Sequence, residues 1–374
     1  MKNLIVFTLG AFFFIAFLLT PLIFLEDDSN IGNSFKYSAL IFYGISATDL
    51  AQDIIGFRAL VMDENAYPNL GVAHEEMGLN FPVDGQSTHL PTTFLFVAPV
   101  AFMPWRYASI TWAIFMLVGI FIFFRMSGFP WPQAIGYGFL SILWLPIMMS
   151  FGQFTILWLV LLIMAYKMRN QESQISGFLI GLATLIKLFP AIMIIPFFLQ
   201  KKWKAIYGFL IAIGMGVVSI LLLSPQSIVA YLNTQQNIRS TIAWSDNSSL
   251  FSIASRYLGI SGIIFVISLL CLFIFLNRAT LRTKEQAIEA QSWAFWTYLS
   301  VILLPVIWIY SLVPLLPVIL DFIKSQKTAV KIIGWLSILI PIFGHPWGDD
   351  SVPYIVGVTL LVGIGITITN RSFA

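Results

Sequence analysis

Residues 205–223 read Ala-Ile-Tyr-Gly-Phe-Leu-Ile-Ala-Ile-Gly-Met-Gly-Val-Val-Ser-Ile-Leu-Leu-Leu and contain no charged side chain. They follow directly on the basic sequence Lys201-Lys202-Trp203-Lys204. A run of about 20 apolar residues is long enough to cross the hydrocarbon core of a bilayer as an α-helix. This stretch therefore predicts a membrane-spanning helix with a positively charged end.

The composition of the whole chain indicates the same environment. Of its 374 residues, 59% are hydrophobic and 10% are charged, whereas soluble domains carry about a quarter charged residues. The net charge of +3 is too small to indicate a nucleic-acid partner. The single cysteine, Cys271, excludes an internal disulfide framework and a thiolate metal site.

Apolar runs that could form membrane helices occur about twelve times. They lie near residues 4–25, 106–124, 132–150, 153–167, 175–189, 190–200, 205–223, 260–277, 290–308, 309–323, 331–344 and 351–369. The first run lacks a small-x-small cleavage site, so we expect a retained helix rather than a signal peptide. Some of the shorter runs would be tilted or re-entrant. We therefore expect an all-α integral membrane protein, with residues 1–374 as a single polytopic domain in the inner (plasma) membrane.

The distribution of charges predicts a topology. With a cytoplasmic amino terminus, the cytoplasmic loops hold 14 of the 20 basic residues, as the positive-inside rule expects. The outer side then holds 13 of the 17 acidic residues and all three histidines. Two outer segments are long, residues 26–105 and residues 224–259. Groups able to act as acid, base or ligand thus gather on the outer side, where we expect the active site.

The first outer segment contains two candidate helices. Asp49, Asp53 and Phe57 recur at helical spacing and would share one face of a helix over residues 49–60. Residues 91–104 are apolar but too short to span a bilayer. We expect them to form a helix that lies at the membrane interface, with Trp105 as an anchor.

Six short motifs follow one another along residues 49–310. They are Asp49-Leu-Ala-Gln-Asp53, His89-Leu-Pro-Thr92, Gly152-Gln153, Lys187-Leu-Phe-Pro190, Asn247-Ser-Ser249 with Arg256, and Pro305-Val-Ile-Trp308-Ile-Tyr310. In this order they resemble bacterial glycosyltransferases of the GT-C superfamily, most closely the phosphatidylinositol-mannoside mannosyltransferases. Thr155 and Tyr310 depart from that pattern, which usually has asparagine and histidine there.

The resemblance implies a GT-C type fold and an inverting sugar transfer on the extracytoplasmic face. The donor would be a polyprenyl-phosphate sugar, with mannose by default, and the acceptor a glycolipid or glycan. Asp49 would be the catalytic base and Asp53 a second carboxylate. Substrate-binding roles fall to His89, Gln153, Lys187, Asn247 and Tyr310. We expect no cofactor and no metal.

Two basic residues of the second outer segment, Arg239 and Arg256, are further candidates for a phosphate partner, because few other cations lie on that side. Lys187 interrupts an apolar run, and a charge within a membrane segment is costly unless it serves a function. We expect it to contact the donor phosphate, although its side chain could instead extend to the membrane interface.

Other site residues also have structural alternatives. Asp49 follows Thr48 and could be the N-cap of a helix. Gln153 could cap a helix end. Asp49, Asp53 and His89 could together bind a divalent metal.

Three other functions compete with the transferase. A transporter or flippase would place ionisable groups at the bilayer midplane and show two related halves, neither of which is visible here. A lipid-linked glycan ligase or polymerase would share the substrate class but usually has arginine-rich outer loops. A structural assembly subunit would tolerate replacement of Asp49.

Overall fold

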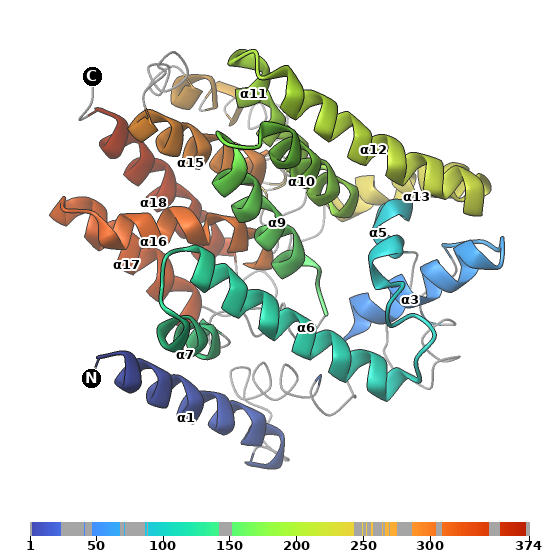
Figure 1. Cartoon of the computed structure of the whole chain (residues 1–374), viewed down its shortest axis with the longest axis horizontal. Helices are drawn as coiled ribbons and strands as arrows, with labels where there is room; N and C mark the ends of the chain where they lie inside the picture. The colour runs from blue at the N-terminus through green and yellow to red at the C-terminus, as the bar shows by residue number, and fades with distance from the viewer. Residues whose placement is uncertain are drawn as a thin grey trace. The chain divides into compact units, whose positions relative to one another are not determined.

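The computed structural model describes residues 2–23, 41, 47–67, 71, 87, 89–141, 152–242, 249, 252, 256, 264, 266–268, 270–274, 286–303, 309–343 and 352–371. Within this part of the chain all regular structure is helical and no strand occurs, which confirms the all-α prediction (Figure 1). The chain divides into two compact units. The first comprises Met1–Leu188 and Tyr207–Ile238, and the second Phe189–Ile206 and Arg239–Ala374. The single polytopic domain stays a prediction.

The first unit is built from helices that follow the predicted apolar runs. Helix α1 (Lys2–Ile23) packs along α7 (Trp131–Ser141), and α6 (Trp105–Met126) packs against both α7 and α9 (Thr155–Met168). Helix α9 forms an antiparallel pair with the next helix, α10 (Ser173–Ile186). The predicted run 132–150 continues beyond α7 into residues outside the described part.

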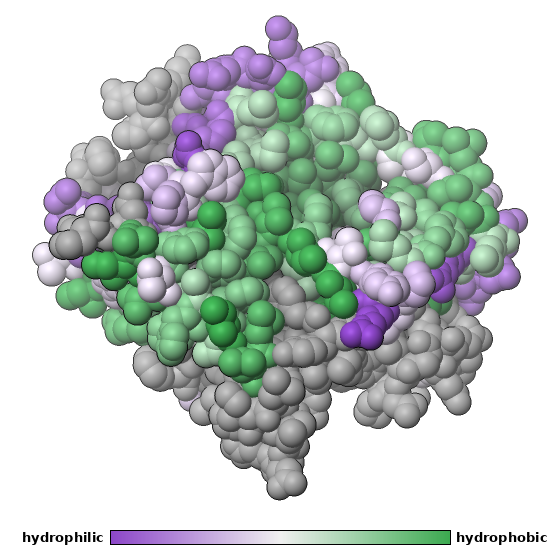
Figure 2. Space-filling model, turned by 60° about the horizontal axis from the view of Figure 1, so that its bottom comes forward, coloured by the Kyte–Doolittle hydropathy of each residue, from purple (hydrophilic) through white to green (hydrophobic). Residues whose placement is uncertain are grey.

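Two helices, α6 and α12 (Trp203–Leu223), are long and apolar enough to cross a membrane by length and composition, whereas the apolar stretches of other helices span 10–17 residues within the described part of the chain. Helix α12 turns Leu210, Met215 and Leu222 outward, with exposed fractions of 56%, 57% and 80%. Apolar side chains cover much of the face drawn in Figure 2. Such a surface is favourable against lipid and costly against water. About twelve crossings, and their orientation, stay predictions.

Two predicted membrane runs form broken helices. Run 190–200 forms the 3-10 helix η3 (Phe189–Ile194) and the short helix α11 (Ile195–Leu199). Run 309–323 forms η5 (Ile309–Leu315) followed by α16 (Leu316–Lys324). Each contains prolines, which lack the N–H that a continuous α-helix requires. Half of run 260–277 lies outside the described residues.

The prediction of one continuous helix over residues 91–104 is wrong, whereas its position at the membrane interface stays a prediction. This segment forms a single turn, α5 (Pro91–Phe94), and then the 3-10 helix η2 (Leu95–Val97). Phe94 and Val97 are fully buried, and α5 packs against both α3 (Thr48–Val61) and α10. A β-carbon at Gly56 of α3 would lie 2.7 Å from the Phe94 ring, so the two helices can approach only through a glycine. The first half of the segment is therefore part of the core, whereas Phe102 and Met103 near its end are exposed.

The second unit has its own apolar core. Helix α15 (Gln286–Ile302) packs against η3 and η5, while α17 (Thr328–Phe343) packs against α16 and α18 (Val352–Arg371). Phe295, Leu299, Ile319 and Val358 are among the buried side chains that fill this core.

Candidate functional site

Helix α3 supplies the two acidic residues of the candidate site. It runs from Thr48 to Val61, which confirms the helix predicted from the spacing of Asp49, Asp53 and Phe57. Asp49 lies in the first turn, and the N-cap position belongs to Ala47. The N-cap interpretation of Asp49 is therefore wrong. Its carboxylate instead lies where the helix dipole favours a negative charge.

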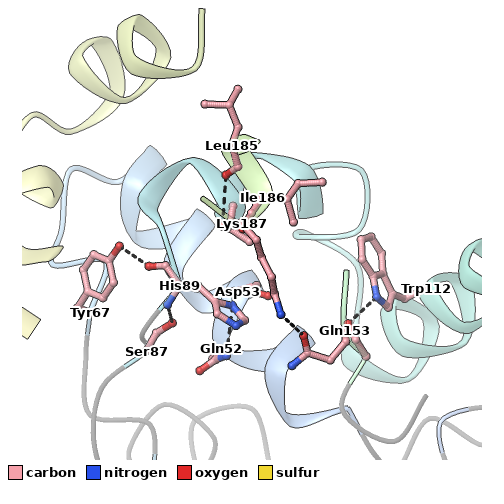
Figure 3. Close-up of polar contacts among 12 residues, drawn as sticks. Gln52, Asp53, Tyr67, Ser87, His89, Trp112, Gln153, Leu185, Ile186 and Lys187 are labelled. Atoms are coloured by element: carbon pink, nitrogen blue, oxygen red, sulfur yellow. Dashed lines mark hydrogen bonds and ion pairs between the residues drawn. The ribbon is translucent and has the colours of Figure 1, made fainter. Parts of the chain in front are cut away.

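Asp53 forms a close pair with His89, which comes from a distant part of the chain. The Nδ1 atom of His89 lies 2.7 Å from Oδ1 of Asp53, and Nε2 of Gln52 lies 3.4 Å from the same ring nitrogen (Figure 3). The Asp53 side chain is fully buried, whereas that of His89 is 15% exposed. With Nδ1–H donating to Asp53, the Nε2 atom of His89 is left as the ring atom that can meet a substrate.

The backbone of His89 is also held in place. The hydroxyl of Tyr67 donates to the His89 carbonyl oxygen at 2.9 Å, and the His89 N–H donates to Oγ of Ser87 at 3.2 Å. Tyr67 is fully buried and its ring packs against those of Phe94 and Tyr231. Burial raises the pKa of Tyr67, so its phenol stays protonated and remains a donor.

The two segments predicted on the outer side contact each other. Tyr231 belongs to α13 (Gln226–Ile242), which lies in the predicted segment 224–259. Nε2 of Gln226 donates to the carbonyl oxygen of Asp63 at 2.7 Å and to its Oδ1 at 3.0 Å. Helix α13 thus packs beside the end of α3, as expected for segments on one side of a membrane.

Lys187 brings a lysine amine to the site. It follows α10 directly in an extended conformation, with φ −146° and ψ 135°. Its Nζ lies 3.5 Å from Oε1 of Gln153, to which it donates (Figure 3). Its charge acts on both Asp49 and Asp53. The side chain therefore turns toward Gln153 and the carboxylates, and its contact with a phosphate stays a prediction.

Gln153 lies in a tight turn before α9. It is almost fully buried, and Phe154 occupies the N-cap of α9, so the helix-capping interpretation of Gln153 is wrong. The indole N–H of Trp112 donates to the Gly152 carbonyl oxygen at 2.8 Å. Gly152 has φ +68°, and a β-carbon there would lie 2.8 Å from Cβ of Leu50.

Replacing Gly152 by alanine is expected to destabilise the protein by about 1–3 kcal/mol, through both the positive φ and the overlap with α3. Thermal unfolding of the purified protein would measure the loss. Gly128→Ala is the matched control, because Gly128 has φ +94° with no atom within 4 Å of its β-carbon position. Equal losses in the two variants would show that the contact with α3 contributes nothing.

The charges of the site shift one another's titration. Burial raises the pKa of the partly exposed Asp49 to about 6, although the charge of His89 opposes the increase. Burial also raises the pKa of Asp53, with His89 offsetting part of the change. Burial alone would lower the pKa of His89, but Asp53 and Asp49 raise it above its usual value. The Asp53–His89 pair therefore retains a proton near neutral pH.

Four of the predicted substrate-binding residues stay predictions. Asn247 lies outside the described residues. Arg239 and Tyr310 lie in helices, but their side chains are not described, and Arg256 is partly exposed. The last three belong to the second unit. Among the described residues, no group of three or more His, Cys, Asp or Glu side chains is placed to hold a metal ion.

Other residues of the site were not predicted. Gln52 and Ser87 contact His89, and Trp112 donates to the turn at Gly152. The hydroxyls of Thr92 and Thr93 donate to carbonyl oxygens at the end of α10. Two adjacent threonines in an otherwise apolar segment were the one available signal, since each hydroxyl needs a partner when buried.

Comparison with known proteins identifies one family. The model of glycosyltransferase family 87 matches residues 88–307, which is more than half of the chain. The match includes His89, Gln153 and Lys187 and begins after Asp49 and Asp53. No curated protein and no solved structure matches the chain.

Proposed function

Because the chain belongs to glycosyltransferase family 87, we propose that it moves a monosaccharide from a polyprenyl-phosphate donor to a lipid or glycan acceptor. The transfer inverts the anomeric carbon, and mannose is the first sugar to test, by resemblance to the phosphatidylinositol-mannoside mannosyltransferases. The reaction takes place on the extracytoplasmic face of the inner (plasma) membrane.

The observation that carries this proposal is the meeting of carboxylates and cations from three distant segments. Helix α3 brings Asp49 and Asp53, the segment before α5 brings His89, and the end of α10 brings Lys187. Sugar transfer from a phosphate donor needs a base for the acceptor and positive groups for the leaving phosphate. Both kinds of group are present in this one place.

We assign the base to Asp49. Asp49 is a partly exposed residue, whereas Asp53 is fully buried with Oδ1 bound to His89. The acceptor hydroxyl oxygen attacks the anomeric carbon as the hydroxyl proton passes to Asp49. The bond between the anomeric carbon and the phosphate oxygen breaks, and polyprenyl phosphate leaves with the electron pair. Because the phosphate leaves without needing a proton, this displacement requires a base but no carboxylic acid.

Lys187 and His89 receive the leaving group. The donor phosphate carries one negative charge as a diester and a second develops on it as the bond breaks. Cations placed beside it therefore stabilise the transition state more than the bound donor. Gln153 holds the Lys187 ammonium group, and Asp53 orients His89 and favours its charged form. Asp53 is thus a positioning residue rather than the base.

The membrane supplies the donor. A polyprenyl chain dissolves in lipid, so an enzyme that uses it works at the bilayer surface. The outward apolar side chains of α12 favour contact with lipid. The contact between α3 and α13 is consistent with both long segments lying on one side.

The activity should depend on pH through Asp49. A base with a pKa near 6 is deprotonated above that pH and loses activity below it. We expect kcat/KM to fall about tenfold per pH unit below about 6 and to level off above it, where Asp49 is deprotonated. Initial rates measured below and above pH 6 would show this fall in kcat/KM, with thermal unfolding at each pH as a control for stability. A fall in kcat/KM centred near the ordinary aspartate pKa of about 4 would contradict the assignment of Asp49 as the base.

The deciding experiment supplies purified protein with polyprenyl-phosphate mannose, radiolabelled in the sugar, and a mixed glycolipid extract. Transfer of label with release of polyprenyl phosphate would establish the activity. Glucose and arabinose donors would test the sugar. If none of the donors reacts, the same protein in sealed vesicles would test the competing transporter or flippase function, which predicts movement of the intact donor across the membrane.

A further inference from the structure

The end of α10 presents an unusual hydrogen-bonding problem. In an α-helix each carbonyl accepts from the N–H four residues later. For the carbonyl of Ile186 that residue is Pro190, which has no N–H. An orphaned carbonyl in apolar surroundings is costly unless another donor replaces the missing one.

The replacement donors come from α5. The hydroxyl of Thr93 donates to the Ile186 carbonyl oxygen at 2.8 Å, and that of Thr92 donates to the Leu185 carbonyl oxygen at 2.7 Å. Thr93 is 1% exposed and Thr92 is 8% exposed, so water does not compete for these bonds. Two side chains more than ninety residues away thus terminate α10.

This termination determines where the next residue points. Lys187 leaves the helix with φ −146° and ψ 135°, and its Nζ reaches Gln153 (Figure 3). If α10 continued for one more turn, the Cα–Cβ bond of Lys187 would tilt toward the N-terminus of the helix. Its side chain would then point in a different direction. The segment that carries His89 also carries Thr92 and Thr93, which follow it in the sequence His89-Leu-Pro-Thr92-Thr93. One short segment therefore holds both cations.

We propose that Thr93, assisted by Thr92, is a positioning residue that fixes Lys187 in the site by completing the hydrogen bonds of α10. The hydroxyl does not touch the substrate. It acts through the main chain, so its loss should change the surroundings of the Lys187 amine before it changes anything else. The role of Lys187 toward phosphate rests on the proposed function, whereas the positioning itself does not.

The first test measures Lys187 directly, without any substrate. The purified full-length protein is treated with a limiting amount of an amine-acylating reagent, and acylation of Lys187 is quantified by mass spectrometry. Thr93→Val keeps the shape and removes the hydroxyl, and we expect the acylation rate to change about three- to tenfold, as befits loss of one hydrogen bond. Thr93→Ser should restore the wild-type rate.

Thr184→Val is the matched control. Thr184 is also buried and lies in α10, but its hydroxyl donates to Ile180 within its own helix. The same chemical change there should leave the acylation of Lys187 at the wild-type rate. If Thr93→Val and Thr184→Val alter it equally, or if neither alters it, the positioning role is overturned.

The second test uses sugar transfer and a double variant. Thr93→Val should change kcat and donor KM in the same pattern as Lys187→Met, but by a smaller factor. Added to Lys187→Met, it should cause no further change, because both act through one amine. If the effects of the two substitutions on kcat and KM multiply in the double variant, the proposal is contradicted. An acylation change in a protein without transferase activity would retain the positioning role and reject the proposed function.

Discussion

Replacing Asp49 by asparagine is expected to lower kcat for sugar transfer by about 10²–10⁴-fold, which is the usual contribution of a general base. The amide has nearly the same shape as the carboxylate but cannot take the proton from the hydroxyl of the acceptor substrate. Donor KM should change little, because Asp49 acts on the acceptor hydroxyl rather than on the phosphate. Release of polyprenyl phosphate by purified wild type and variant would measure the effect.

Two further asparagine variants of the same segment make this prediction specific. Asp53→Asn should cost about ten- to a hundredfold, since a neutral amide can accept only a weaker hydrogen bond from His89 and no longer favours its charged form. Asp63→Asn should be close to wild type, because Asp63 is exposed and an amide oxygen can still accept from Gln226. If Asp53→Asn abolishes turnover while Asp49→Asn retains it, the base lies one helical turn further along α3.

The sequence alone was sufficient to predict helix α3 and its acidic face. Asp49, Asp53 and Phe57 are spaced by four residues, and that period is a local property of a helix. The interrupting charge of Lys187 was also visible, because a cation within an apolar run has few structural explanations. The apolar runs likewise predicted the all-helical fold, since each needs only its own residues to form its hydrogen bonds.

The pairings within the site could not be predicted in this way. Asp53 and His89 are separated by 36 positions, and Lys187 and Gln153 by 34. No local period links residues so far apart, and only the packing of α3, α5 and α10 brings them together. The continuous helix expected at 91–104 failed for the same reason. Its apolar side chains fit a membrane surface as well as a core, and nothing local revealed that α10 needed the hydroxyls of Thr92 and Thr93.

Replacing Lys187 by methionine is expected to lower kcat by about 10²–10³-fold, the range seen when one donor to a developing negative charge is removed. The methionine retains most of the apolar stem and removes the ammonium group. The charge on the departing phosphate doubles as its bond to the sugar breaks, so the missing cation affects kcat more than donor KM. Steady-state rates over a range of donor concentrations would separate the two constants.

Two other lysine variants distinguish this role from a general effect of charge. Lys187→Arg keeps the charge but replaces a compact ammonium group by a planar, larger guanidinium group, so we expect partial activity. Lys204→Met removes an exposed cation from the start of α12 and should leave both constants unchanged. If Lys187→Met raises donor KM without lowering kcat, the lysine binds donor and transition state equally. The stabilisation of the departing phosphate would then rest on His89, and His89→Gln would become the variant that lowers kcat.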